Sequence, residues 1–373
     1  MDKKRIQQSD VKVGEPLKWP VFDDRGILLL RKGYVITTPS QLQSLLNRGL
    51  YLHQAPPPRP AIEEKSAVTI SPFHIFDNLQ VRVKRLCDDI QGGNINDIPG
   101  RISQICQVIQ KVVQMDADAM IGAIHLIQEG HYTVLHSLHA AILAEIFLRS
   151  LSISAEDRLP ILAAAMTKDV GMMDLQETLR KQNAPLTDEQ FAWVRAHPLR
   201  SLELLEKAGV KDGIWLEAVR HHHERLDGSG YPDGIQEEDI FFPVRILALV
   251  DIYTAMIKRR AYRDSLKSRD AMREIFTKHA SEVDAHLTKL FIKELGLFPP
   301  GVFVKLRNSE VAIVTRRGKQ GTVPIVHTII GPRGAPLAKA LKRDTAQDDY
   351  AIHEVVDRDL QVTLNLHSLW GYN

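Results

Sequence analysis

The feature that most constrains this fold is a long stretch, from about residue 71 to 298, in which apolar side chains recur at helical spacing. In "RISQICQVIQKVVQMDADAMIGAIHLIQ", "HSLHAAILAEIFLRSL" and "RILALVDIYTAMI" the apolar residues follow the period of an α-helix rather than that of a strand. Pro160, Pro185, Pro198 and the glycine-rich stretch from Gly228 to Gly234 are expected to interrupt the helices. The pattern therefore predicts a large helical bundle over residues 71–298 and a mainly α fold class.

Different patterns flank this bundle. Residues 1–55 indicate a small N-terminal α/β module, because "LKWPVFDDRGILLLRKG" places two apolar runs around a turn and "TTPSQLQSLLNRGL" predicts a helix. Consecutive prolines predict a linker over residues 56–70. After "LGLFPPG" the segments "VFVKLRNSEVAIVTRR" and "TVPIVHTII" are rich in β-branched residues, which predicts a small β-rich appendage over residues 299–373.

Composition excludes several classes of function. The net charge of +2 in 373 residues is too small to predict a surface for a nucleic acid polymer or a membrane. No apolar run is long enough to predict a membrane span, and the polar start "MDKKRIQQSD" is not that of a secretory signal. Cys87 and Cys106 are the only cysteines, so no disulfide framework is implied and a cytoplasmic location is expected.

Histidines and carboxylates inside the apolar runs are the candidate functional residues. An ionised carboxylate among hydrophobic side chains is costly unless it is paired or bound to metal, so Asp169 and Asp251 need partners. Imidazoles and carboxylates from facing helices are suitable ligands for a transition metal. The candidates are His136, Asp169, His197, the contiguous His221, His222, His223 and Glu224, and Asp251.

Each candidate also has an ordinary structural explanation. A lone histidine such as His136 in an amphipathic helix is more often a satisfied or half-exposed side chain. The alternatives for the others are a helix end for His197, pairing with Arg245 or Arg220 for Asp251, and exposure to solvent for residues 221–223. The order and spacing of the whole set favour a shared site.

Residues 132–265 resemble the HD-GYP domain, a family of helical phosphohydrolases that hydrolyse cyclic di-GMP. The most specific match is "HHERLDGSGYPDG", and "YTVLHS", "TKDVG", "LTDEQFAWVRAHP" and "RILALVDIYTAMIKRRAYR" match further family motifs in order. The resemblance implies that the bundle is of the HD superfamily. It also implies a metal-dependent cyclic di-GMP phosphodiesterase, a hydrolase of second-messenger signalling.

The resemblance assigns roles to individual residues. One or two divalent transition metal ions, with iron and manganese the favoured elements, would be held by His136, Asp169, His197, His222, His223 and Asp251. Asp169 would bridge two metal ions. Arg260 and Arg263 would bind the dinucleotide phosphates, which suit guanidinium forks. Tyr231 would lie at the rim of the site, and His221 would be structural. The implied partners are cyclic di-GMP and, through the Gly-Tyr-Pro loop, other signalling proteins.

The chain departs from the family at the His-Asp dipeptide that names it. None of its 15 histidines precedes an aspartate, and the dipeptide position is occupied by Lys168 and Asp169. A protonated ammonium has no lone pair, so Lys168 cannot be a metal ligand. Three further departures are Met172 in place of a lysine, Thr254 in place of an aspartate, and Tyr132 in place of the glutamate of three-metal members.

These departures leave two hypotheses. In the first, one metal is lost and the other is held by Asp169, His197, His222 and His223. Lys168 then places its charge near Asp169 and Asp251, and Asp169 and Lys168 are the catalytic residues of a weakened hydrolase. In the second, the pocket is catalytically inactive and the protein is a cyclic di-GMP sensor or a protein-interaction module. Met172 favours the second hypothesis, and the retention of the other ligands favours the first.

Overall fold

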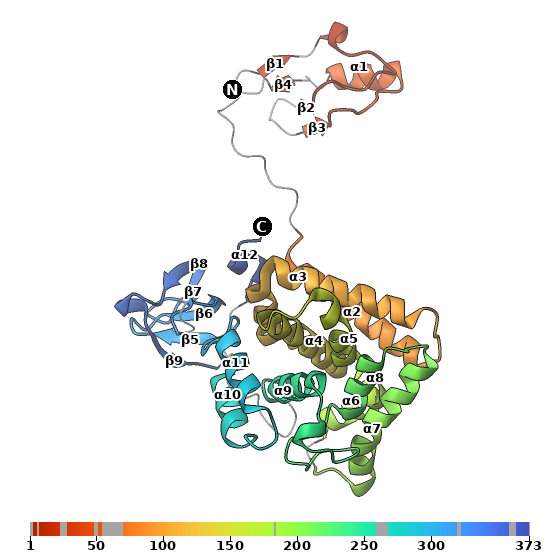
Figure 1. Cartoon of the computed structure of the whole chain (residues 1–373). Helices are drawn as coiled ribbons and strands as arrows, with labels where there is room; N and C mark the ends of the chain where they lie inside the picture. The colour runs from red at the N-terminus through yellow and green to blue at the C-terminus, as the bar shows by residue number, and fades with distance from the viewer. Residues whose placement is uncertain are drawn as a thin grey trace. The chain divides into compact units, whose positions relative to one another are not determined.

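The computed structural model describes residues 3–5, 7–22, 28–47, 51–53, 70–182, 184–258, 268–318, 322–357 and 363–372. The chain divides into two compact units, residues 1–69 and residues 70–373 (Figure 1). The linker predicted over residues 56–70 lies outside the described residues except for Ile70. In the described part of the chain, no helix is both long and apolar enough to cross a membrane.

The N-terminal unit combines a small sheet with one α-helix. Its strands are β1 (Lys3–Arg5), β2 (Val21–Phe22), β3 (Leu28–Leu30) and β4 (Tyr51–His53), paired antiparallel in the order β1-β4-β2-β3, and its helices are α1 (Pro39–Asn47) and the 3-10 turn η1 (Gln8–Asp10). The β2–β3 pair corresponds to the two apolar runs of the sequence. A separate small core of Val11, Leu17, Val21, Ile36 and Leu42 holds this unit together.

The second unit is the predicted helical bundle. Its helices are α2 (Pro72–Gln91), α3 (Ile98–Leu126), α4 (Tyr132–Ser150), α5 (Ala155–Thr167), α6 (Met173–Lys181), α7 (Asp188–Lys207), α8 (Gly213–His221), α9 (Phe242–Met256), α10 (Ser268–Thr277) and α11 (Ala285–Leu295), with 3-10 turns η2 (Val170–Met172) and η3 (Glu237–Asp239). Helix α4 is buried on every side from Tyr132 to Leu148, since it packs against α2, α3, α5 and α9 (Figure 1). A helix that is apolar all round belongs in the centre of a bundle.

Two of the expected helix interruptions are wrong. Pro160 lies inside α5 and Pro198 lies inside α7, whereas Pro185 falls between α6 and α7 as predicted. A proline removes one backbone hydrogen bond from a helix. Both helices nevertheless continue, because the residues after each proline are packed into the core, as Ile161 and Ser201 show.

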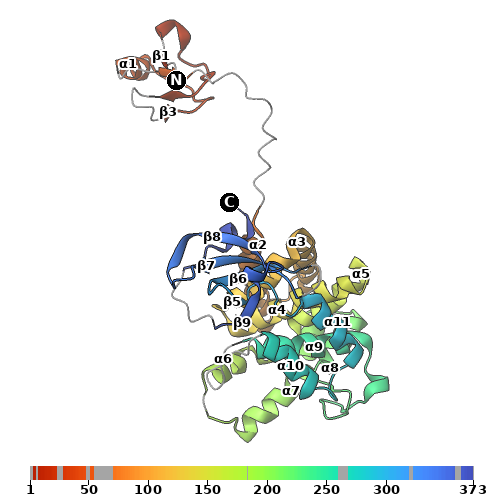
Figure 2. The same cartoon turned by 90° about the vertical axis from the view of Figure 1, so that its left-hand side faces the viewer.

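The C-terminal part is the predicted β-rich appendage. An antiparallel sheet in the order β8-β7-β6-β5-β9 is formed by β5 (Phe303–Leu306), β6 (Val311–Arg316), β7 (Ile325–Ile330), β8 (Pro336–Asp344) and β9 (Ile352–Val355). The 3-10 turn η4 (Asp348–Tyr350) lies between β8 and β9, and α12 (Leu366–Trp370) follows β9. Figure 2 shows the strands side by side. Arg316 pairs with Asp116 and Arg317 with Asp118 at 2.5 Å each, which joins the sheet to α3.

Candidate metal centre

The bundle brings the predicted ligands together from segments far apart in the chain. They come from α4 (His136), from the turn after α5 (Asp169), from α7 (His197), from the end of α8 (His222 and His223) and from α9 (Asp251). Two groups of these residues share Asp169: one adds His197, His222 and His223, and the other adds His136 and Asp251. Within each group the potential ligand atoms lie within 4.8 Å of one another.

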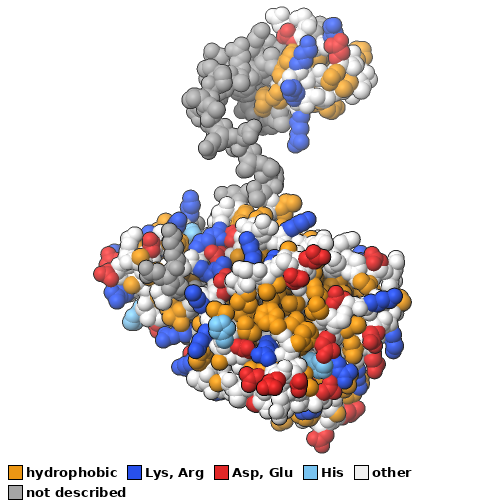
Figure 3. All heavy atoms as spheres, in the orientation of Figure 1, with side chains coloured by type: hydrophobic (Ala, Val, Ile, Leu, Met, Phe, Trp, Pro, Cys, Tyr) orange, Lys and Arg blue, Asp and Glu red, His pale blue; other side chains and the backbone are white. Residues whose placement is uncertain are grey.

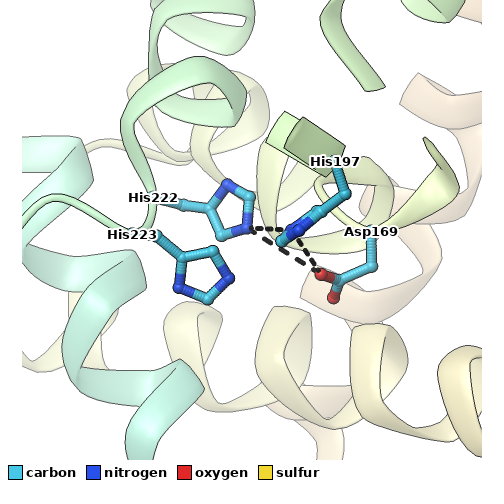
Figure 4. A group of neighbouring side chains, drawn as sticks. All are labelled: Asp169, His197, His222 and His223. Atoms are coloured by element: carbon cyan, nitrogen blue, oxygen red, sulfur yellow. Dashed lines mark hydrogen bonds and ion pairs between the residues drawn. The ribbon is translucent and has the colours of Figure 1, made fainter. Parts of the chain in front are cut away.

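Backbone carbonyls orient two imidazoles of the first group. The Nδ1 atom of His197 lies 2.5 Å from the carbonyl of Val194, and the Nδ1 atom of His222 lies 2.6 Å from the carbonyl of Val219. A carbonyl can only accept, so each Nδ1 carries the proton and each Nε2 keeps its lone pair. The two Nε2 atoms face each other at 3.0 Å, and they lie 3.4 Å (His197) and 3.8 Å (His222) from Oδ1 of Asp169 (Figure 4).

This arrangement fits a metal cation. Two facing lone pairs and a carboxylate oxygen repel one another unless a positive charge lies between them. Burial is the main cause that lowers the pKa of His222 to about 3 and the pKa of His223 well below its usual value. Both imidazoles are therefore neutral at pH 7. Three imidazoles and one carboxylate are a donor set that iron, manganese and similar divalent ions accept.

Pro198 leaves free the carbonyl of Val194, which orients His197. A residue at this place in α7 would normally donate its N–H to the carbonyl of Val194, four residues earlier, but proline has no N–H. The free carbonyl accepts from His197 instead. His222 follows the last turn of α8, where the carbonyls have no helical partner. Sequence reasoning gave Pro198 only a helix-breaking role, although the His-Pro dipeptide inside an apolar helix was the available signal.

The second group surrounds the ammonium of Lys168. This side chain is 0% exposed, and its Nζ lies 2.5 Å from Oδ2 of Asp169 and 2.6 Å from Oδ1 of Asp251. His136 directs its Nε2 to the same Oδ1 of Asp251 at 2.8 Å, and 3.4 Å separate it from Nζ. The ammonium therefore occupies the space that a metal would need between these ligands.

The ammonium and the two carboxylates keep one another charged. Burial alone would lower the pKa of Lys168, but Asp169 and Asp251 raise it above its usual range. Burial would raise the pKa of both aspartates, and the neighbouring ammonium instead holds them well below their usual values. Asp169 thus bridges two positions, with Oδ2 on the ammonium and Oδ1 toward the imidazoles.

The backbone around Lys168 is fixed against α7. Ser201 Oγ donates to the carbonyl of Lys168 at 2.6 Å and accepts from the N–H of Gly171 at 3.0 Å. A Cβ at Gly171 would lie 2.7 Å from the backbone nitrogen of Ser201, so the close approach of the two segments requires glycine. On the other side, Nε1 of Trp215 donates to Oγ1 of Thr167 at 2.8 Å.

The alternative partners proposed for Asp251 are engaged elsewhere. Arg245 pairs with Asp284 at 3.2 Å, and Arg220 pairs with Asp233 at 2.9 Å. His197 does not end a helix, because α7 continues to Lys207.

The loop after His223 is built on its own polar network. His221 directs Nε2 to Asp233 at 2.8 Å, and Oε1 of Glu224 accepts from the N–H groups of Asp233 (2.7 Å) and Gly234 (3.1 Å). A Cβ at Gly230 would lie 2.5 Å from the Cα of Glu224, so only glycine fits there. These contacts explain the cluster of His221, Glu224 and Asp233 as loop structure, in agreement with the structural role expected for His221.

Tyr231 lies where the loop meets the ligands. The Tyr231 ring stacks on the His223 ring, with the two centroids 4.8 Å apart. The guanidinium carbon of Arg195 lies 4.9 Å from the centroid of the Tyr231 ring. Arg195 was not among the residues predicted from the sequence. Arg260 and Arg263, the predicted phosphate-binding residues, lie outside the described residues.

A cavity of about 580 Å³ opens onto both groups. Its polar lining includes His136, Asp169, His223, Tyr231 and Asp251, and its apolar lining includes Tyr132, Met172, Leu179, Leu186 and Val194. Two of the residues that differ from the family pattern, Met172 and Tyr132, therefore line this cavity. The third, Thr254, instead donates its Oγ1 hydroxyl within its own helix to the carbonyl of Val250 at 2.6 Å. In Figure 3, hydrophobic side chains gather over the region where Figure 1 draws α4 and α9.

Histidine and aspartate side chains from facing helices of a bundle are a suitable setting for a transition metal. The family model of the HD domain matches residues 117–287. The resemblance to the HD-GYP family that the motifs predict is confirmed by this match to the HD domain and by curated relatives that are named cyclic di-GMP phosphodiesterases.

Curated relatives have consistent names. The chain is 26% identical over 232 residues to the cyclic di-GMP phosphodiesterase PA4108 of Pseudomonas aeruginosa. This match covers 62% of this chain and 56% of that protein. It is 24% identical over 201 residues to the cyclic di-GMP phosphodiesterase PdeB of Borreliella burgdorferi, covering 54% of this chain and 53% of that protein. It is also 27% identical over 168 residues to the 3'3'-cGAMP-specific phosphodiesterase 3 of Vibrio cholerae, covering 45% and 36%. The chain thus spans about half the length of the first two relatives.

A solved structure shows the same fold. Bd1817, an HDG"Y"P protein from Bdellovibrio bacteriovorus, superposes with a TM-score of 0.50 at 14% identity, covering 78% of this chain and 98% of that one.

Proposed function

We propose that this protein hydrolyses the phosphodiester of a cyclic dinucleotide and that cyclic di-GMP is the favoured substrate. A single divalent metal ion would be bound by Asp169, His197, His222 and His223. The observation that carries the proposal is that the Nε2 atoms of His197 and His222 converge at 3.0 Å beside Oδ1 of Asp169, an arrangement that a metal cation would satisfy. The names of the relatives support the substrate class. The donor set suits iron or manganese.

The residues of the site would divide the work of hydrolysis. A divalent ion at the imidazole group would lower the pKa of a bound water and neutralise charge on the phosphoryl oxygens. The Lys168 ammonium offsets the charges of Asp169 and Asp251, which would otherwise repel an anionic phosphodiester. The motif assigns Arg260 and Arg263 to the phosphates, whose oxygens match the fork of a guanidinium.

Metal analysis combined with a hydrolysis assay tests this proposal. Purified protein loaded with manganese or ferrous iron is expected to contain about one ion per chain and to convert cyclic di-GMP to a linear product, detected by chromatography. His222→Ala should lose both the ion and the hydrolysis, because it removes one ligand. His286→Ala, on an exposed part of α11, is the matched control and should lose neither. Wild-type protein with no bound metal and no linear product would overturn the proposal.

A second candidate function is that of a catalytically inactive cyclic di-GMP sensor. It is favoured by Lys168, which fills one of two adjacent cation positions, and by Met172, which presents a thioether to the cavity. A sensor would bind cyclic di-GMP in the metal-loaded state without converting it, and the double substitution Arg260→Ala and Arg263→Ala would abolish binding. A protein-interaction module would instead lose a partner on Tyr231→Ala and bind no nucleotide.

A further inference from the structure

A second cavity lies beside the first. Its volume is about 370 Å³, and it is lined by residues of α2, η2, α6 and α7, among them Gln91, Gly171, Met172, Asp174, Glu189 and Trp193. Met172 lines both cavities, so the two cavities adjoin at this residue. At the same boundary Gln182 of the first cavity and Gln190 of the second exchange side-chain hydrogen bonds of 3.1 and 2.9 Å.

An aromatic platform forms one wall of this second cavity. Trp193 lines it and is 43% exposed, whereas a large aromatic side chain is ordinarily much more buried. The guanidinium carbon of Arg200 lies 3.2 Å from the centroid of the indole. The Nη1 atom of Arg200 is buried and has no hydrogen-bond partner among the residues that the structure describes. The guanidinium is thus held by its stacking on the indole, which fixes the position of the Trp193 ring at the wall of the cavity.

Two carboxylates line the same cavity. Neither Asp174 nor Glu189 makes an ion pair within the described ranges of the chain. Ionised carboxylates only accept hydrogen bonds. The cavity therefore offers a flat aromatic surface and hydrogen-bond acceptors. These groups suit a flat heteroaromatic ring that has hydrogen-bond donors on its edge.

We propose that the second cavity binds a guanine base of the cyclic dinucleotide whose phosphodiester lies at the metal centre. This inference rests on the proposed function. Guanine stacks on aromatic planes, and its N1–H and N2 amino groups suit carboxylate acceptors. Adenine has an amino group in place of O6 and lacks the N1–H, so it matches these groups less well.

The junction of the cavities permits this placement. A cyclic dinucleotide carries a base on each side of its phosphodiester ring, so a base can enter one cavity while a phosphate remains in the next. The side chain between the two cavities is Met172, an unbranched thioether that adapts its shape readily. Met172 stands where the family has a lysine, so this departure would serve base binding rather than phosphate binding.

Binding measurements on the metal-loaded full chain test the inference. Trp193→Ala is expected to weaken binding of cyclic di-GMP by at least about tenfold, the usual effect of losing one base-stacking surface. The double substitution Asp174→Asn and Glu189→Gln should reduce the preference for cyclic di-GMP over cyclic di-AMP by about tenfold, because amides can donate to adenine. Phe191→Ala, an exposed residue of α7 that lines neither cavity, is the control and should bind as wild type does.

The outcomes separate this inference from the proposed function. If wild type hydrolyses cyclic di-GMP while Trp193→Ala and the carboxylate variant bind it unchanged, the guanine subsite is wrong and the hydrolase stands. If GMP quenches the wild-type tryptophan fluorescence and Trp193→Ala abolishes this signal, but cyclic di-GMP is not hydrolysed, the subsite stands and the hydrolase is wrong. If wild type binds neither nucleotide, both are overturned.

Discussion

Replacing Lys168 by methionine removes the internal cation of the site while keeping a side chain of similar length. The change deprives Asp169 Oδ2 and Asp251 Oδ1 of contacts of 2.5 and 2.6 Å. Both carboxylates are almost fully buried, and removal of one partner from a buried ion pair costs about 3–5 kcal/mol. Because a folded domain is stable by only about 5–15 kcal/mol, the metal-free variant should lose a large part of its free energy of unfolding.

Urea unfolding of metal-free protein at pH 7, followed by circular dichroism and tryptophan fluorescence, measures this loss. Trp215 reports close to the site, since it donates to Thr167, the neighbour of Lys168. Lys84→Met is the matched control: Lys84 pairs with Asp88 at 2.6 Å, but the two side chains are 40% and 50% exposed. Loss of such a surface pair should cost less than about 1 kcal/mol.

Two further variants test the cause. Adding Asp251→Asn to Lys168→Met should recover part of the lost stability, because it removes one of the uncompensated charges. Lys168→His should raise the metal content toward two ions per chain and increase hydrolysis, since a neutral imidazole supplies the missing lone pair. If metal-free Lys168→Met unfolds at the same urea concentration as wild type, or if Lys168→His binds no additional metal, an ammonium does not take the place of a metal here.

Three other results are expected. Pro198→Ala should weaken manganese binding by about tenfold in a titration, because the new N–H would compete with His197 for the carbonyl of Val194, and unchanged affinity would remove the orienting role of proline. The unfolding free energy of the metal-free protein should fall from pH 7 to pH 5 by up to about 1.4 kcal/mol per pH unit for each buried histidine. The reason is that the pKa in the folded protein is about 4 for His125 and about 3 for His222, so only the unfolded chain takes up protons near pH 6.5. An unfolding free energy that stays the same from pH 7 to pH 5 would contradict this expected fall. Gly230→Ala should destabilise the protein by about 1–3 kcal/mol and reduce metal content, since its Cβ would lie 2.5 Å from backbone atoms, whereas a neutral effect would show that the loop adapts.

Periodicity alone was sufficient for the architecture. The apolar spacing over residues 71–298 predicted the bundle, and β-branched runs predicted the C-terminal sheet, because burial of one face or stripe is a local property of the chain. The prolines were misjudged where packing outweighed a local rule. Pro160 and Pro198 remain inside helices whose following residues are buried.

The sequence by itself also determined which chemical groups were available: the histidines, the two aspartates and a lysine in place of a histidine. The family resemblance led to the expectation that the charge of Lys168 lies near Asp169 and Asp251, but only the tertiary structure determined the contacts themselves. Asp251 is 83 residues away from Lys168 and reaches it through the packing of α9 beside α4 and α5. The same holds for the protonated nitrogen of each imidazole, which depends on carbonyls left free at Pro198 and at the end of α8. Residue type fixes what a group can donate or accept, but the fold fixes which partner it meets.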